Sequence, residues 1–181
     1  VNKQGWFRWI YEDGNISEHK KILELGCGDG RLWVDNISNV AEAVHIKKIT
    51  VTDISEGMVN DARRNIECAI REASFTLNSN ISQKFEYGMA DCQSIPYEDN
   101  TYDCIIANHV MFYCDNIDKA FGEIQRVLKP GGIFICATYG SHHMQEISKL
   151  VKEFDKRIVL AADNLYDKFG LEGGEELLDG Y

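Results

Sequence analysis

The chain has 181 residues, of which 44% are hydrophobic and 27% are charged, so it is long enough for one globular domain with a full core. Its formal net charge of −10 argues against a nucleic-acid-binding surface, because such surfaces take most of their affinity from clustered Lys and Arg. We expect one domain over residues 1–181, with its core in residues 20–140 and a helical, truncated C-terminal segment in residues 141–181.

The six cysteines favour a reduced compartment. They form no C-x-x-C pair, and several lie within apolar runs, so a cytoplasmic protein is expected. No apolar run approaches the roughly twenty residues of a membrane span, and we therefore expect none. No group of His, Cys, Asp and Glu has the spacing of metal ligands, so no metal site is predicted. The sequence carries no signal of oligomeric state.

Strand-like and helix-like segments alternate along the chain. This alternation predicts an α/β fold, with a Rossmann-like, doubly wound and mainly parallel sheet that has helices on both faces. The expected strands are residues 22–25, 49–54, 85–91, 102–108 and 133–138. The expected helices are residues 56–70, 117–128, 143–154 and 177–178. Ser55 stands where it can cap the first of these helices, and Pro130-Gly131-Gly132 should end the second. Residues 74–82 are expected to form a loop.

Three glycines at alternate positions, Gly26, Gly28 and Gly30, follow the first expected strand. A side chain there would forbid a positive φ or hold a ligand away from the backbone. The start of the following helix offers free amide groups, which suit a carboxylate or a phosphate. Dinucleotides and S-adenosylmethionine both fit such a turn, but the dinucleotide fingerprint G-x-G-x-x-G needs a glycine at Arg31. An ordinary tight turn is the alternative.

Polar residues stand at the end of each later strand. They are Asp53, Asp91, Asn108-His109 and residues 139–143. In an open parallel sheet, ligands bind at the carboxyl ends of the strands where the strand order reverses. One cleft is therefore expected to collect these residues. The alternative for Asp53 and Asp91 is that they only cap helices or form turns.

Five blocks of sequence carry a family resemblance. They are LELGCGDG (23–30), TDISEGM (52–58), ADCQSIPY (90–97), YDCIIAN (102–108) and RVLKPGG (126–132). In these blocks, and in their order, the chain resembles the class I S-adenosylmethionine-dependent methyltransferases. Within that group it is similar to the methyltransferase type 11-like, small-molecule branch that contains the ubiquinone and menaquinone biosynthesis C-methyltransferases. The resemblance implies S-adenosyl-L-methionine as cofactor, S-adenosyl-L-homocysteine as product, and methyl transfer to a small molecule.

The resemblance also implies a set of cofactor contacts. Asp53 would accept hydrogen bonds from the ribose hydroxyls, and Asp91 would accept one from the adenine amine. The backbone N–H of Cys92 would meet a ring nitrogen, and the apolar Ile54 and Met58 would sandwich the base. The implied contacts are Glu24, Gly26, Cys27, Gly28, Gly30, Asp53, Ile54, Met58, Asp91, Cys92 and Asn108.

At the methionine end of the cofactor, the resemblance places Gly26, Cys27 and Gly28. Asn108 would bond this end through its backbone carbonyl. Cys27 is expected to be a small residue beside the cofactor and not a nucleophile. Glu24 has an alternative role as a structural acid paired with nearby amides.

The reaction implied is attack by an O, N, S or C atom of the acceptor on the sulfonium methyl group. A base helps only where the acceptor must lose a proton. The candidates for such a base are His109 and His143, followed by His142, Tyr113 and Tyr139. The N-terminal aromatic cluster, residues 6–11, is expected to pack on the sheet with one aromatic face turned to the site.

Two other functions remain open. One is an NAD-dependent oxidoreductase, which gives no reason for Asp91 or for the turn at residues 128–132. The other is a non-catalytic protein that binds S-adenosylmethionine. The chain also departs from the family at its end, because class I methyltransferases usually close the sheet with a hairpin of two further strands. No such pair is visible before Tyr181, so those strands either lie outside the sequence or are replaced by other structure.

Overall fold

The computed structural model describes residues 4–73, 80–140, 142–155, 157–158 and 168–179. The strands in this part of the chain are β1 (Lys21–Leu25), β2 (Lys48–Asp53), β3 (Phe85–Met89), β4 (Tyr102–Asn108) and β5 (Leu128–Ala137). They form one sheet in the order β3-β2-β1-β4-β5, and all four pairings are parallel. The order reverses between β1 and β4, where open α/β sheets bind their ligands.

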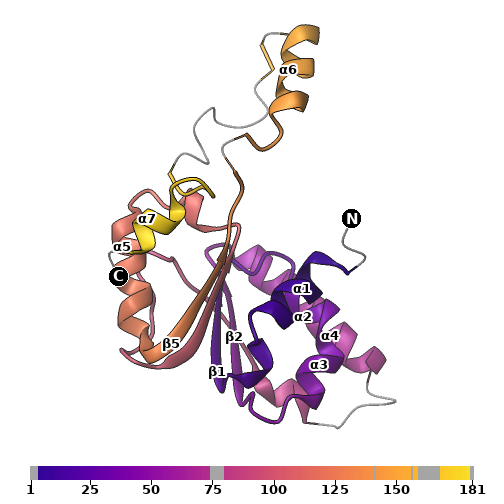
Figure 1. The fold of residues 1–181 in the computed structure, drawn as a ribbon. Helices are drawn as coiled ribbons and strands as arrows, with labels where there is room; N and C mark the ends of the chain where they lie inside the picture. Colours follow the sequence, from indigo (N-terminus) through magenta and orange to yellow (C-terminus); the bar gives the residue numbers. More distant parts are fainter. Residues whose placement is uncertain (1–3, 74–79, 141, 156, 159–167, 180–181) are drawn as a thin grey trace.

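Helices cover both faces of this sheet. The helices and short 3-10 turns are α1 (Trp6–Asp13), η1 (Ile16–Glu18), α2 (Arg31–Asp35), α3 (Ile37–Glu42), α4 (Glu56–Ala73), η2 (Ile81–Lys84), η3 (Met111–Tyr113), α5 (Ile117–Val127), α6 (Gln145–Phe154) and α7 (Gly174–Leu178). Figure 1 shows α1 to α4 on one face and α5 and α7 on the other. The prediction of a doubly wound, mainly parallel sheet is confirmed.

Alternate residues of the central strands build two separate hydrophobic layers. Ile22 of β1 and Ile106 of β4 pack into the layer formed with α1 to α4. Their neighbours Leu23 and Ile105 pack into the layer formed with α5. All four side chains are fully buried. Because both faces of these strands are covered, apolar residues follow one another directly in them, as in Ile22-Leu23 of β1 and residues 104–107 of β4.

The first four strands lie within two residues of their predicted bounds, but β5 begins five residues earlier than predicted. Tyr102 pairs with Leu128 and Cys104 pairs with Ile133, so residues 129–132 form a bulge in β5. Pro130 has no N–H to donate, and it is tolerated because β5 is the outer strand of the described sheet. Helix α5 ends at Val127, before Pro130-Gly131-Gly132 as predicted, but these three residues lie in the bulge of β5, so the predicted start of the strand was wrong.

Helix boundaries agree more closely with the sequence. Ser55 caps α4 as predicted, since its Oγ accepts a hydrogen bond from Met58 N at 3.4 Å. Asn116 caps α5 through a bond from Lys119 N to its Oδ1 at 2.9 Å. After the glycine turn, the helical segment is interrupted at Asn36, whose side chain donates to Leu32 O at 2.8 Å. The segment after the glycine turn therefore forms two short helices, α2 and α3.

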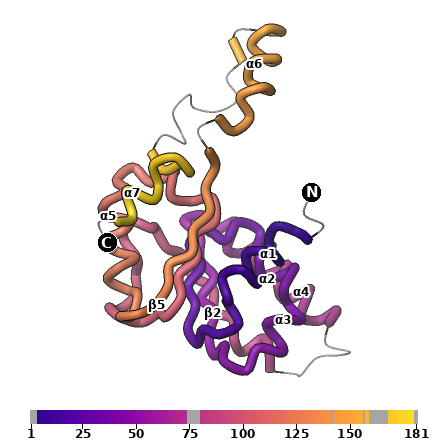
Figure 2. The backbone as a smooth tube through the Cα atoms, in the orientation of Figure 1, coloured from indigo at the N-terminus to yellow at the C-terminus, as the bar shows by residue number. Residues whose placement is uncertain are grey.

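Helix α6 extends away from the sheet (Figures 1 and 2), and its residues include no buried side chain. The described residues after β5 form the helices α6 and α7 and no further strand. Parts of the predicted loop at 74–82 and of the predicted C-terminal segment 141–181 lie outside the described residues. Within the described ranges, no helix is both long enough and apolar enough to cross a membrane.

Candidate functional site

The turn after β1 places its backbone at the carboxyl ends of the central strands. Gly26 and Gly28 have φ angles of +70° and +53°, where any side chain is strained. A Cβ at Gly26 would overlap Val110 Cγ2, so the turn packs directly against the segment after β4. A Cβ at Gly28 would have no neighbour within 4 Å. The turn therefore leaves open space at Gly28, where a ligand fits.

Asp53, the last residue of β2, holds this turn from the side. Its Oδ2 accepts a hydrogen bond from Gly28 N at 3.1 Å, and its Oδ1 accepts one from Ser55 N at 2.9 Å. Each carboxylate oxygen has a further lone pair, so Asp53 can also accept hydrogen bonds from a ligand. The turn-forming role and the ligand-binding role predicted for this residue are compatible.

Asp91 lies two residues beyond β3, in a loop that is braced from the β4 side. Its Oδ1 accepts a hydrogen bond from Gln93 N at 2.8 Å. The Gln93 side chain in turn accepts from Asn116 N at 2.8 Å. The side chains of Cys92 and Cys114 are hydrogen-bonded, and this bond, with burial, raises the pKa of the Cys92 thiol. The loop after β3 and the segment before α5, which are separate in the sequence, thus pack together.

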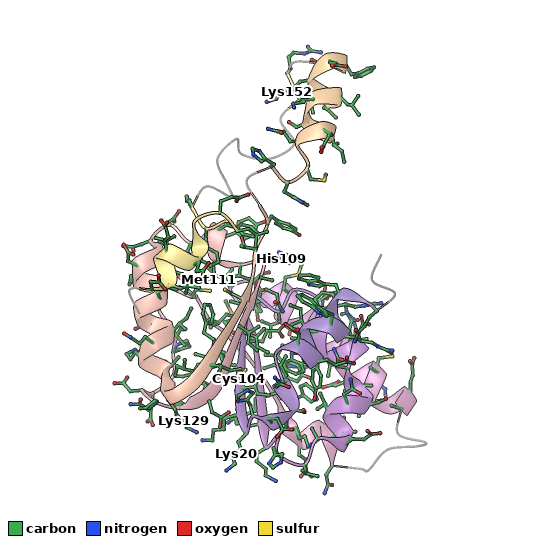
Figure 3. All side chains as sticks on the ribbon, viewed as in Figure 1. Lys20, Cys104, His109, Met111, Lys129 and Lys152 are labelled. Carbon is green, nitrogen blue, oxygen red and sulfur yellow. The ribbon has the colours of Figure 1, made fainter. Side chains whose placement is uncertain are left out.

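These residues line a cavity of about 590 Å³ at the carboxyl ends of the strands. Figure 3 shows His109 and Met111 at this end of the sheet, with Lys20 and Lys129 at the opposite end. Ile54 and Met58 are 67% and 42% exposed, so an apolar surface is available to a flat ring. The predicted cofactor contacts that line the cavity are Gly26, Gly28, Asp53, Ile54, Met58, Asp91, Cys92 and Asn108.

Sequence reasoning missed four lining residues, which are Ala90, Gln93, Val110 and Cys114. All four lie within six residues of the end of β3 or β4. The rule that ligands bind at strand ends would have found them if it had been extended further along each loop. Gln93 and Val110 matter most, because one braces the Asp91 loop and the other fixes Gly26.

Three predicted cofactor contacts, Glu24, Cys27 and Gly30, do not line this cavity. Glu24 is 3% exposed, and its Oε2 accepts a 2.6 Å hydrogen bond from Trp33 Nε1. Its surroundings match the alternative role of structural acid. Burial also raises the pKa of the Cys27 thiol, which keeps it protonated and unreactive. Gly30 packs against α4, where a Cβ would come within 3.0 Å of Ala62.

The carboxyl end of β4 carries polar atoms that have no partner. The side-chain amide of Asn108 is shielded from solvent and both of its polar atoms lack a hydrogen bond. Because an unsatisfied buried amide costs about 1–3 kcal/mol, such atoms usually meet a ligand or an ordered water. His109 follows in a left-handed conformation with φ +56°, which is rare for a residue with a side chain. Strain of this kind gathers at functional sites.

Of the histidines considered as bases, only His109 lines the cavity. Burial, and secondly the neighbouring His143, lower its pKa, so the ring is neutral at pH 7. His142 and His143 are exposed. Tyr113 also lines the cavity, whereas Tyr139 stacks on His109 at 4.2 Å between ring centroids. In the N-terminal aromatic cluster Ile10 and Tyr11 are buried, as predicted, whereas Trp6 and Trp9 are exposed. Trp6 stacks on His109 but does not itself line the cavity, so the predicted contact of one aromatic face with the site stays a prediction.

Comparison with known proteins adds a family match. A family model described as a methyltransferase domain matches residues 23–136. Sterol 4-C-methyltransferase strm-1 of Caenorhabditis elegans is 34% identical over 126 residues, which are 70% of this chain and 33% of that protein. Demethylmenaquinone methyltransferase of Symbiobacterium thermophilum is 30% identical over 131 residues, 72% of this chain and 47% of that protein. The chain thus spans half or less of the length of these relatives.

Solved structures share the fold. A putative S-adenosyl-L-methionine-dependent methyltransferase from Methanococcus maripaludis has a TM-score of 0.61 at 21% identity, over 96% of this chain and 74% of that one. The [4+2]-cyclase SpnF has a TM-score of 0.55 at 27% identity, over 71% of this chain and 42% of that one. The first similarity shows the fold. The second shows that a protein named for a cyclase activity has the same fold.

Proposed function

Because the chain belongs to the methyltransferase domain family, we propose that it transfers the methyl group of S-adenosyl-L-methionine to a small-molecule acceptor. The observation that carries this proposal is the single cavity that collects Gly28, Asp53 and Asp91 from the ends of three neighbouring strands. Named relatives that act on a sterol and on demethylmenaquinone support a small-molecule acceptor. S-adenosyl-L-homocysteine is the other product.

The residues of the cavity fit the cofactor chemically. Asp53 offers free lone pairs to the ribose hydroxyls, and Asp91 offers them to the adenine amine. Ile54 and Met58 offer apolar surface to the adenine ring. The unpartnered amide of Asn108 and the open space at Gly28 suit the polar methionine end. The cofactor supplies a methyl group on a positively charged sulfur, which leaves as a neutral thioether when the acceptor attacks in line.

The protein's part in this reaction is mainly positioning. Holding the acceptor at near-attack distance contributes on the order of 7–11 kcal/mol in well-oriented systems. We assign the acceptor side of the cavity to the residues after β4, among them His109 and Tyr113, because the turn after β1 and the ends of β2 and β3 are assigned to the cofactor. Of the two histidines predicted as bases, His109 is favoured because it lines the cavity and His143 does not.

Cofactor binding is the first experiment. Isothermal titration should show binding of S-adenosyl-L-methionine and of S-adenosyl-L-homocysteine, and no binding of NAD. Asp53→Ala is expected to weaken this binding about 10- to 100-fold, because hydrogen bonds to a charged acceptor contribute about 1.5–3 kcal/mol. Asp61→Ala, which removes an exposed acid paired with Arg64, is the matched control. Equal affinities for both variants would contradict the proposed site.

A second candidate function follows from the likeness to SpnF. That protein is named for a cyclase activity and is 27% identical to this chain. Because a protein with this fold is named for ring formation, the second candidate is a protein that uses the same cavity without transferring a methyl group. Formation of S-adenosyl-L-homocysteine with a panel of phenols, enols, carboxylic acids and amines separates the two. Tight cofactor binding with no product across a broad panel would favour the second candidate.

A further inference from the structure

A row of stacked aromatic rings includes His109, which lines the cavity on its proposed acceptor side. Trp6 of α1 stacks on His109 with 5.6 Å between centroids and 28° between planes. Tyr139, after β5, stacks on His109 at 4.2 Å and 14°, and His143 stacks on Tyr139 at 4.0 Å and 17°. Three segments that are far apart in the sequence therefore meet at one imidazole.

The backbone also fixes this imidazole. His109 N donates a 2.8 Å hydrogen bond to Ala137 O, the last residue of β5. Together with the left-handed φ of +56°, this bond turns the residue out of the line of β4. Because Trp6 and Tyr139 both stack on the imidazole, we take its edge as the part that is offered to a ligand.

The two ring nitrogens have different surroundings. Nδ1 is shielded from solvent and has no hydrogen-bond partner, whereas Nε2 is not shielded in this way. With a proton, Nδ1 would be a buried donor without an acceptor, and without one it is a buried acceptor without a donor. An unpaired buried N–H is the rarer of these two states in folded proteins. The favoured neutral form therefore carries its proton on Nε2. Accepting a second proton would also place an unsatisfied N–H at Nδ1.

We infer that His109 is a neutral hydrogen-bond donor, through Nε2–H, to a lone pair of the methyl acceptor, and that Trp6 and Tyr139 are the residues that position it. This inference rests on the proposed methyl transfer and narrows the role of base considered for His109. A donor at this point stabilises the deprotonated form of an acceptor that carries an acidic group. The acceptor's proton leaves to water, and its lone pair forms the new bond to the methyl group.

The ionisable groups around His109 do not supply a partner for Nδ1. Tyr139 stacks on His109 and His143 stacks on Tyr139, both from the segment after β5, and Tyr113 of η3 lines the same cavity as His109. Asp53 and Asp91 lie on the other strand ends of the same cavity. In α1, Arg8 is directed to α2, where its Nε donates to Asp35 O at 3.3 Å.

The tautomer and the titration of the His109 ring can be measured without a methyl acceptor. Nitrogen-15 NMR of the protein saturated with S-adenosyl-L-homocysteine should show His109 as the Nε2–H tautomer, neutral at pH 7. Its signals are assigned by their loss in His109→Asn. Trp6→Ala and Tyr139→Ala should each move its pKa upward, toward the 6.5 of a free imidazole, and mix the tautomers. Trp6→Phe and Tyr139→Phe should retain the parent spectrum, as should Trp9→Ala, which changes the neighbouring ring of α1.

Activity separates a donor from a base. Asn and Asp both tolerate the left-handed backbone of this position. His109→Asn keeps a donor and should retain product formation within about tenfold of the parent. His109→Asp keeps a base without a donor and should lose about 100-fold, the usual cost of removing one charge-stabilising donor. Trp6→Ala and Tyr139→Ala should lower kcat while KM for S-adenosyl-L-methionine changes less than threefold.

Several outcomes overturn the inference. One is an Nδ1–H tautomer or an imidazolium ring at pH 7, and another is greater activity of His109→Asp than of His109→Asn. Unchanged ring titration in both alanine variants of the stack would exclude the positioning role. These results are distinct from failure of the proposed function, which would appear as absence of cofactor binding or of S-adenosyl-L-homocysteine formation in the parent protein.

Discussion

Replacing Gly26 by alanine is expected to destabilise the protein by about 2–5 kcal/mol. A left-handed backbone costs a residue with a Cβ about 1–2 kcal/mol, and forcing atoms into a packed site costs about 1–3 kcal/mol more. Both terms apply, because Gly26 has φ +70° and its Cβ would overlap Val110 Cγ2. Urea unfolding followed by circular dichroism measures the change.

Gly28→Ala is the matched control for this prediction. Gly28 has a similar φ of +53°, but its Cβ would have no neighbour within 4 Å. The expected loss is only the backbone term of about 1–2 kcal/mol. Val110→Ala should recover part of the stability of Gly26→Ala in the double variant, because the two side chains share one space. Equal losses at Gly26 and Gly28 would contradict the packing between the turn and Val110.

The second large effect is a pH dependence of folding that is removed by Glu24→Gln. Burial raises the pKa of Glu24 from 4.5 to about 7 in the folded protein. Between these two values the folded state binds more protons than the unfolded state, so stability falls as the pH rises. The fall attributable to Glu24 is about 3 kcal/mol, complete near pH 7. The glutamine variant should match the parent near pH 4.5 and exceed its stability at pH 8.

The difference in the free energy of unfolding between Glu24→Gln and the parent protein reports on Glu24 alone. Free energies of unfolding measured from pH 4.5 to pH 8 should diverge steadily for Glu24→Gln. Glu98→Gln, which changes an exposed carboxylate, should run parallel to the parent. Cofactor affinity should change less than threefold in Glu24→Gln, because Glu24 bonds to Trp33 and does not line the cavity. A tenfold loss of cofactor affinity in Glu24→Gln would indicate that Glu24 contacts the cofactor after all.

The sheet and most of the cavity could be predicted because their causes are local. Strands such as β4 are continuous apolar runs, and the polar residue that ends each run marks the edge where ligands bind. Asp53 and Asp91 were predicted from this pattern, and both line the cavity. Ser55 was recognised as a cap because capping depends on a bond to a backbone amide three residues away.

The remaining features depend on contacts between distant residues. The bulge in β5 exists because Tyr102 pairs with Leu128, which no local pattern of residues 128–133 reveals. Glu24 turns to Trp33 because the helix after the glycine turn places an indole N–H beside β1. The stack on His109 joins α1 to the segment after β5. Trp6 and Tyr139 could be singled out from the sequence as aromatic residues, but their stacking on His109 could not be predicted.

The contact between Gly26 and Val110 joins the two halves of the cavity. The glycine turn belongs to the proposed cofactor side, and Val110 adjoins His109 on the proposed acceptor side. We therefore expect occupancy of one half to change the free energy of occupancy in the other, and thermodynamic reciprocity makes such an effect equal in both directions. Any change in acceptor affinity caused by the cofactor should be matched by the same factor in cofactor affinity caused by the acceptor.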